Sequence, residues 1–186
     1  SAQGFVEDQL DPATQTSVLE YIIDRLPTYY DENNVAVQTL RSVTNLGIFC
    51  PLDVDLRVKA VAQFSTLPMA ERLAIANKRV ANILAKADEE ASLTAVSETL
   101  FTSEFERRLA EKLKIVSEAC ADSIVNRDYG EALKQLAILD KPLADFFENV
   151  MVNSEDPSLR VNRISLLSSV HAEFMKVADI SQLAGS

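Results

Sequence analysis

Positively charged side chains recur at even spacing along one predicted helix, a pattern suited to binding a polyanion. Arg72, Arg79 and Lys86 each lie seven residues apart, so at about 100° per residue they fall on one line beside the apolar stripe of the helix. Cations in such a row could follow a nucleic-acid backbone, and Asn77, on the other flank, could reach a base edge. Lys78 lies on the opposite side and adds a further candidate cation. The alternative is that Arg72 and Arg79 pair with acidic neighbours at the edge of the core.

The last long helix carries a second group of polar candidates. Its buried arc should consist of apolar residues at helical spacing, namely Leu159, Leu166, Val170, Phe174 and Val177. Arg160 and Asn162 fall on opposite borders of this arc, and we take both as candidate ligand-binding residues, with Arg160 the better exposed. Arg163 falls inside the arc, where a guanidinium cannot lose its proton and must find a carboxylate or carbonyl oxygens. We therefore predict that Arg163 is structural and joins this helix to the preceding one through Asp145 or Glu148, rather than contacting a ligand.

Side chains for catalysis or metal binding are scarce in this sequence. His171 is the only histidine, and Cys50 and Cys120 lie far apart, with no Cys or His partner at metal-ligand spacing. The phosphate-binding and nucleophile patterns G-x-G-x-x-G, G-x-x-x-x-G-K-[ST] and G-x-S-x-G do not occur. We expect no catalysis by this chain alone, no metal, no cofactor and reduced cysteines.

The composition favours a helical protein with a substantial core. Of 186 residues, 47% are hydrophobic, and only 4 Gly and 6 Pro interrupt the chain. Long alternating runs of Val, Ile and Thr, which are typical of strands, are absent. No apolar stretch approaches the roughly 18 residues that a membrane span needs, and no signal peptide is recognisable. We expect an all-α, cytoplasmic protein.

Capping residues and prolines predict where the helices begin and end. Start signals occur at Asp11, Asp53, Ser103, Asp128, Pro142 and Asp156. The first helix should end near Pro27, a second in residues 35–46 should end at Gly47, and another should cover residues 68–86. These signals imply at least six helices. We assign residues 1–186 to one helical domain, in which residues 1–50 could form an N-terminal subdomain.

The net charge limits the kind of nucleic-acid binding that this chain can perform. It carries 18 Lys and Arg against 28 Asp and Glu, a formal net charge of −10. A protein that holds nucleic acid mainly by neutralising phosphates is basic, so indiscriminate binding is excluded. A local basic patch that reads a few unstacked loop bases is compatible with this charge. The acidic surface and the 6% of aromatic residues, with no Trp, also fit a helical protein-interaction module.

Two stretches of the chain resemble a known family. Residues 145–183 read DFFENVMVNSEDPSLRVNRISLLSSVHAEFMKVADISQL, and residues 73–86 read LAIANKRVANILAK. Both resemble the β subunit of the bacterial two-subunit glycyl-tRNA synthetase, whose helical anticodon-binding domain, of the DALR type, has the pattern FFD-x-VMV, an acidic turn, LR-x-NRL-x-LL and VADIS. The chain departs from it at Pro157 and Ser158, which replace the Asp and Ala of DALR. No part resembles the catalytic or HD-type portions of that enzyme.

This resemblance implies a fragment of a longer β subunit that selects tRNA(Gly) by its anticodon, with the candidate residues above as tRNA contacts. The implied partners are the anticodon arm of tRNA(Gly), the rest of the β subunit and the α subunit, with no DNA and no membrane. ATP would be used by the whole enzyme, which joins glycine to its tRNA. Glycine anticodons end in two cytosines, whose edges offer a donor and acceptors that Asp, Glu, Asn or Arg can read. The anticodon-binding domain of a related enzyme, such as arginyl-tRNA synthetase, is a further alternative.

Overall fold

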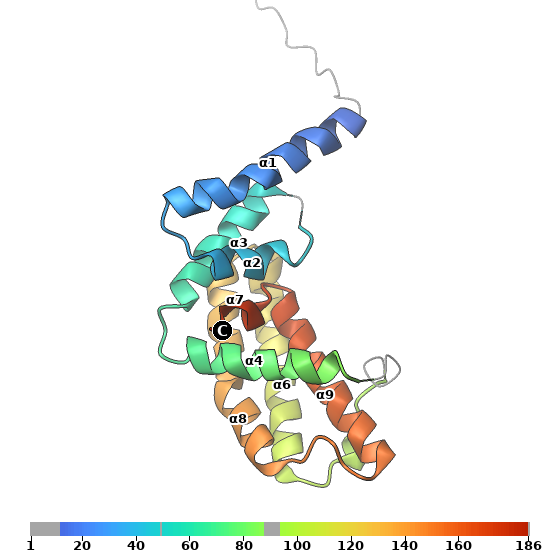
Figure 1. Ribbon diagram of the computed structural model, residues 1–186. Helices are drawn as coiled ribbons and strands as arrows, with labels where there is room; N and C mark the ends of the chain where they lie inside the picture. The colour runs from blue at the N-terminus through green and yellow to red at the C-terminus, as the bar shows by residue number, and fades with distance from the viewer. Residues whose placement is uncertain (1–11, 49, 88–93, 186) are drawn as a thin grey trace, which may run out of the picture.

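Helices make up all the regular secondary structure in the part of the chain that the computed structural model describes, residues 12–48, 50–87 and 94–185 (Figure 1). The α-helices are α1 (Pro12–Glu32), α2 (Val37–Thr44), α3 (Pro51–Phe64), α4 (Ala70–Leu84), α6 (Glu104–Val125), α7 (Tyr129–Leu136), α8 (Asp140–Asn149) and α9 (Pro157–Met175). Short 3-10 turns are η1 (Glu98–Leu100), η2 (Ala137–Leu139) and η3 (Ile180–Leu183). The predicted all-α class, with at least six helices, is confirmed.

Local capping chemistry starts several helices at the predicted residues. The Ser103 hydroxyl accepts a hydrogen bond from the backbone of α6, and the Glu106 carboxylate accepts one from the backbone N–H of Ser103, which completes the capping box. The carboxylates of Asp128 and Asp156 cap α7 and α9. Gly47 follows α2 with a φ of +66°, a conformation that costs a residue without Cβ little. The cap expected at Asp11 lies outside the described residues.

Several predicted helix boundaries are wrong. Helices α2 and α4 are each two residues shorter at both ends than the predicted ranges 35–46 and 68–86. Helix α1 continues through Pro27 to Glu32, although proline removes one backbone hydrogen bond. Tyr30 explains this continuation, because it is buried and its hydroxyl donates to Asp55 of α3 at 3.0 Å. Helix α3 begins at Pro51 rather than at Asp53, since proline suits the first helical position. Helix α8 begins at Asp140, before Pro142.

Helix α4 lies across the surface of the helices that follow it in the chain. Helix α6 packs against α7, α8 and α9, whereas α4 contacts α8, α9 and η3. Figure 1 shows α4 lying across this group, while α1 extends away from the body above α2 and α3. The buried apolar side chains form one cluster that reaches from Tyr30 in α1 to Ile180 in η3. Helix α4 therefore has two neighbours, α8 and α9, with which it can form a shared surface.

The division of the chain into one domain with a subdomain in residues 1–50 stays a prediction.

Candidate nucleic-acid interface

A cleft lined by positive charges lies between α4, the turn that follows it and the first turns of α9. Its volume is about 750 Å³. Its cations are Lys78, Arg79, Lys86 and Arg160, its amides are Asn82 and Asn153, and its apolar residues are Ile75, Ile83, Ala87, Val161 and Ile164. No Asp or Glu of the described residues lines it. The cleft thus combines cations, amides and an apolar floor, which are the groups that contact phosphates, base edges and base faces respectively.

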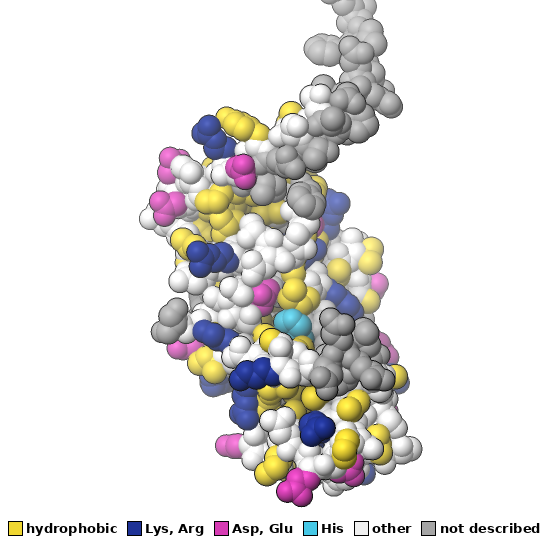
Figure 2. Space-filling view, turned by 45° about the vertical axis from the view of Figure 1, so that its right-hand side comes forward, with side chains coloured by type: hydrophobic (Ala, Val, Ile, Leu, Met, Phe, Trp, Pro, Cys, Tyr) yellow, Lys and Arg dark blue, Asp and Glu magenta, His cyan; other side chains and the backbone are white. Residues whose placement is uncertain are grey.

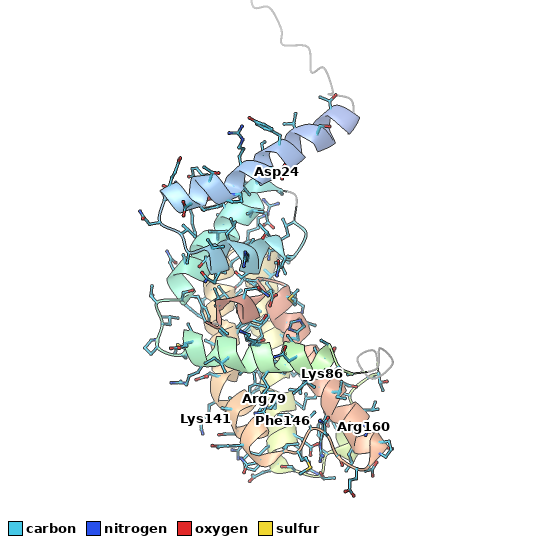
Figure 3. All side chains as sticks on the ribbon, viewed as in Figure 1. Asp24, Arg79, Lys86, Lys141, Phe146 and Arg160 are labelled. Atoms are coloured by element: carbon cyan, nitrogen blue, oxygen red, sulfur yellow. The ribbon has the colours of Figure 1, made fainter. Side chains whose placement is uncertain are left out.

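Helical spacing and helix packing together bring these cations to one place. Arg79 and Asn82 lie three residues apart on α4 and so share one face of it, and Lys86 follows four residues later in the turn after the helix. Arg160 joins them because the cap at Asp156 starts α9 just before it and α9 packs on α4. Figure 3 shows Arg79 and Lys86 along the α4 segment and Arg160 on the neighbouring α9. Figure 2 shows several Lys and Arg side chains close together on one face, with hydrophobic side chains between them.

The charges of the cleft are available to a ligand. Within residues 12–48, 50–87 and 94–185, no salt bridge involves Arg79, Lys86 or Arg160. Lys78 has one weak contact, from Nζ to the backbone oxygen of Gly185 at 3.5 Å. The Arg79 guanidinium lies over the Phe147 ring of α8, with Cζ 4.1 Å from the ring centroid. A ring leaves the N–H donors of Arg79 unused, whereas a carboxylate would occupy them.

Arg72 does not belong to the cleft, which corrects the prediction of one continuous row of cations. Its Nη2 atom pairs with Oδ2 of Asp140 at 2.5 Å. This hydrogen bond and the charge of Asp140 raise the pKa of the Arg72 guanidinium. Asp140 is the first residue of α8, so the pair links α4 to α8. The alternative considered for Arg72, pairing with an acidic neighbour, is the observed one.

The two amides predicted as ligand contacts, Asn77 at a base edge and Asn162 on the border of the buried arc, are buried instead. Asn77 is 1% exposed, and its Nδ2 donates to the backbone oxygen of Leu73. Asn162 is 2% exposed and bonds to both backbone groups of Ser97, accepting from its N–H at 2.7 Å and donating to its oxygen at 3.0 Å. Neither side chain is therefore exposed to a ligand, which corrects both predictions. The reason is that η3 covers one flank of α4 and the segment before η1 covers one flank of α9, so both buried faces are wider than the apolar stripes.

Arg163 is structural, as predicted, but its partner is different. It is 8% exposed, and its Nε donates to Oε1 of Glu106 at 2.9 Å. Asp145 instead pairs with Lys141, and Glu148 is exposed. The prediction that α9 is joined to α8 through Asp145 or Glu148 is thus corrected: the partner lies on α6, 57 residues earlier in the chain.

Sequence reasoning missed some residues of the cleft and misplaced another. Asn82 could have been found, because it lies on the same helical face as Arg79 and Lys86. Asn153 stands in the turn between α8 and α9, and no local pattern marks it. Lys78 was placed opposite the row but lines the cleft beside Arg79.

Other kinds of site are not indicated by the described residues. They contain no group of three or more His, Cys, Asp and Glu side chains placed to hold a metal ion. Among their helices, none is both long and apolar enough to span a membrane.

Comparison with known proteins identifies the family of this chain. Residues 73–182 match the family described as "DALR anticodon binding domain", a range that contains α9 and all of α4 except its first three residues. The "Glycine--tRNA ligase beta subunit" of Haemophilus influenzae (strain PittEE) is 39% identical over 183 residues, which are 98% of this chain and 26% of that protein. The protein of the same name from Photobacterium profundum is 41% identical over 167 residues, 90% of this chain and 24% of that protein. The chain therefore spans about a quarter of the length of the curated relatives that it matches. Because the matched range covers more than half of its residues, the chain belongs to the DALR anticodon binding domain family.

Proposed function

We propose that this chain binds the anticodon arm of a tRNA in the cleft between α4 and α9. The observation that carries the proposal is the gathering of Lys78, Arg79, Lys86 and Arg160 around one cleft in a chain whose net charge is −10. Such local concentration of positive charge attracts phosphate, while the acidic remainder repels nucleic acid bound elsewhere. Membership of the anticodon-binding family supports the same ligand.

The dimensions and lining of the cleft suit unpaired nucleotides rather than a duplex. Its volume of about 750 Å³ lies in the range of pockets that hold one small ligand, so it can take only a few nucleotides. Lys86 and Arg160 would contact phosphates, and the amides of Asn82 and Asn153 each offer one donor face and one acceptor face to a base edge. Sequence-specific RNA recognition generally uses loop bases presented in this way.

We further propose that the chain is part of the β subunit of a glycine–tRNA ligase and that its RNA is tRNA(Gly). Identities of about 40% over nearly the whole chain to proteins of that name support this. The partners would then be the rest of the β subunit and the α subunit, in the cytoplasm, with no role for DNA or a membrane. The whole enzyme, not this chain, would use ATP and join glycine to the tRNA.

Kinetics of the complete ligase test this function. Replacing Arg79 or Arg160 by Ala should raise KM for tRNA(Gly) and leave ATP-dependent glycine activation unchanged, because the reacting centre lies elsewhere. Lys134→Ala on α7 is the matched control, since Lys134 is exposed, pairs with Glu131 and lies outside the cleft. Loss of glycine activation, or unchanged tRNA kinetics in both cleft variants, would contradict the proposal.

A second candidate function, assembly with another protein surface, is favoured by α1. Val18, Tyr21 and Ile22 are 46%, 61% and 36% exposed on this helix, which extends from the body (Figure 1). The partner would be the remainder of the β subunit, because the matched relatives are about four times as long as this chain. Replacing Val18 and Tyr21 by Ser should weaken binding of this chain to that remainder and leave RNA affinity intact. Unchanged association would exclude α1 as the contact.

A further inference from the structure

The Arg79–Phe147 contact differs from the other charged contacts at the edge of α8. Arg72, two turns earlier on α4, pairs with the Asp140 carboxylate, whereas Arg79 lies over an aromatic ring at 4.1 Å. At this distance the guanidinium touches the ring, and the contact fixes the position of the side chain. Arg79 nevertheless remains exposed and lines the cleft, so part of its surface faces a ligand.

The ring beneath Arg79 is itself firmly placed. Its neighbour Phe146 is completely buried and anchors α8 in the core. The two rings pack edge to face, with centroids 5.7 Å apart and an interplanar angle of 71°, which is a favoured geometry for aromatic pairs. Phe147 is only half-buried, so it supports Arg79 from the edge of the core.

We infer that the Arg79–Phe147 pair is a stacking platform for one unstacked base of the bound RNA. This inference rests on the proposed function and specifies its mechanism. The base would lie on the face of the guanidinium that is turned away from Phe147, since nucleic-acid bases stack on Arg planes as they do on aromatic rings. Asn82, which lies one helical turn after Arg79, and Asn153 then meet the base edge from within the same cleft. Lys86 and Arg160 hold the phosphates.

A stacking platform requires a different property of Arg79 than a phosphate contact does. A phosphate contact needs a positive charge, which Lys also supplies, whereas a platform needs the planar guanidinium. The test is therefore Arg79→Lys, together with Phe147→Leu, which removes the support beneath the plane. The matched control is Arg108→Lys, because Arg108 also lies near a phenylalanine, Phe105, but at 5.9 Å and outside the cleft.

The probes are a short RNA hairpin with the glycine anticodon loop and a series of the same hairpin with one loop nucleotide made abasic. Arg79→Lys should raise the Kd of the intact hairpin by about tenfold, the loss of one base stack. One abasic position should weaken binding to the unchanged protein by a similar factor, and at that position Arg79→Lys should cause no further loss. Phe147→Leu should behave in the same way, and Arg108→Lys should bind as the unchanged protein does. Thermal unfolding of each variant separates a binding effect from a folding defect.

Other results would overturn the platform. If Arg79→Lys binds the hairpin as tightly as the unchanged protein does, no base stacks on the guanidinium plane of Arg79. If Arg79→Lys loses the same factor on every abasic hairpin, Arg79 contacts the backbone or only holds α4 to α8. Failure of the proposed function looks different: no hairpin would bind the unchanged protein, whereas failure of the platform alone leaves hairpin binding intact and sensitive to Lys86→Gln and Arg160→Gln.

Discussion

Arg163 and Glu106 form an ion pair that is almost completely removed from water. Glu106 is 0% exposed and Arg163 is 8% exposed. The Oε1 atom of Glu106 accepts from Arg163, while Oε2 accepts from the backbone N–H groups of Thr102 and Ser103. The remaining guanidinium donors bond to the backbone oxygen of Met151 and the hydroxyl of Thr102. One carboxylate therefore caps α6 and also holds α9. Removing either partner would leave the charge of the other buried and unpaired.

We predict that Arg163→Ala lowers the free energy of unfolding by about 3 kcal/mol or more, because it leaves the Glu106 carboxylate buried and unpaired. Denaturant unfolding measures this directly. Arg108→Ala is the matched control on α6, since its ion pair with Glu104 is exposed and should be worth less than about 1 kcal/mol. Equal losses in the two variants would show that burial does not govern the Arg163 pair.

Among the elements, α3, α7 and the end of α9 are joined by one arginine. The guanidinium of Arg57 donates to Asp53 at 2.9 Å, to the backbone oxygens of Lys176 and Val177 at 2.7 Å, and to the Tyr129 hydroxyl at 3.0 Å. Tyr129 in turn donates to Asp53. Burial raises the pKa of the Asp53 carboxyl, but the hydrogen bonds from Tyr129 and Arg57 outweigh it, so the net pKa lies below the ordinary value.

This shift predicts how stability depends on pH. Because the pKa of Asp53 is lower in the folded than in the unfolded chain, its stabilising contribution is complete above the unfolded pKa of about 4 and is lost as the pH falls through the lower, folded pKa. The free energy of unfolding should therefore differ between the unchanged protein and Asp53→Asn at neutral pH, and the difference should shrink below about pH 4. Urea unfolding at a series of pH values checks this. A difference that stays constant down to acidic pH would mean that Asp53 is not held in its charged form by this network.

At the scale of the whole molecule, a net negative protein carries a small positive cleft. Because the chain carries 28 acidic against 18 basic residues, we expect RNA to release counterions mainly at the cleft. We expect the affinity for the anticodon hairpin to fall with salt as for about two to four phosphate contacts, at about 0.7 to 0.9 log units per contact. Lys86→Gln should reduce this slope by about one contact, and Lys134→Gln, outside the cleft, should not change it. Binding measured at several salt concentrations decides this. A steep dependence of log Kd on salt that Lys86→Gln does not change would show that the phosphate contacts lie elsewhere.

The sequence alone determined the local events that start and stop helices. Ser103 with Glu106, Asp128, Asp156 and Gly47 act on backbone groups within a few residues of themselves, so their effect is written in short stretches of sequence. The same holds for the position of Arg163 on the buried arc of α9, because helical periodicity relates residues of a single helix. Residues 73–86 and 145–183 also carried the family resemblance, which the match to residues 73–182 confirms.

Only the tertiary structure decided which of these helices meet. Arg163 pairs with Glu106 rather than with Asp145, and Arg72 pairs with Asp140. The partners of each pair lie on different helices, so helical periodicity does not relate them. Asn77 and Asn162 are too buried to contact RNA, because neighbouring segments cover the flanks of their helices. The cleft itself exists because α4 lies across α8 and α9, which brings Lys86 to Arg160 and sets Phe147 beneath Arg79. Periodicity tells which side of a helix is buried, but the width of that side and the partner that covers it depend on non-local packing.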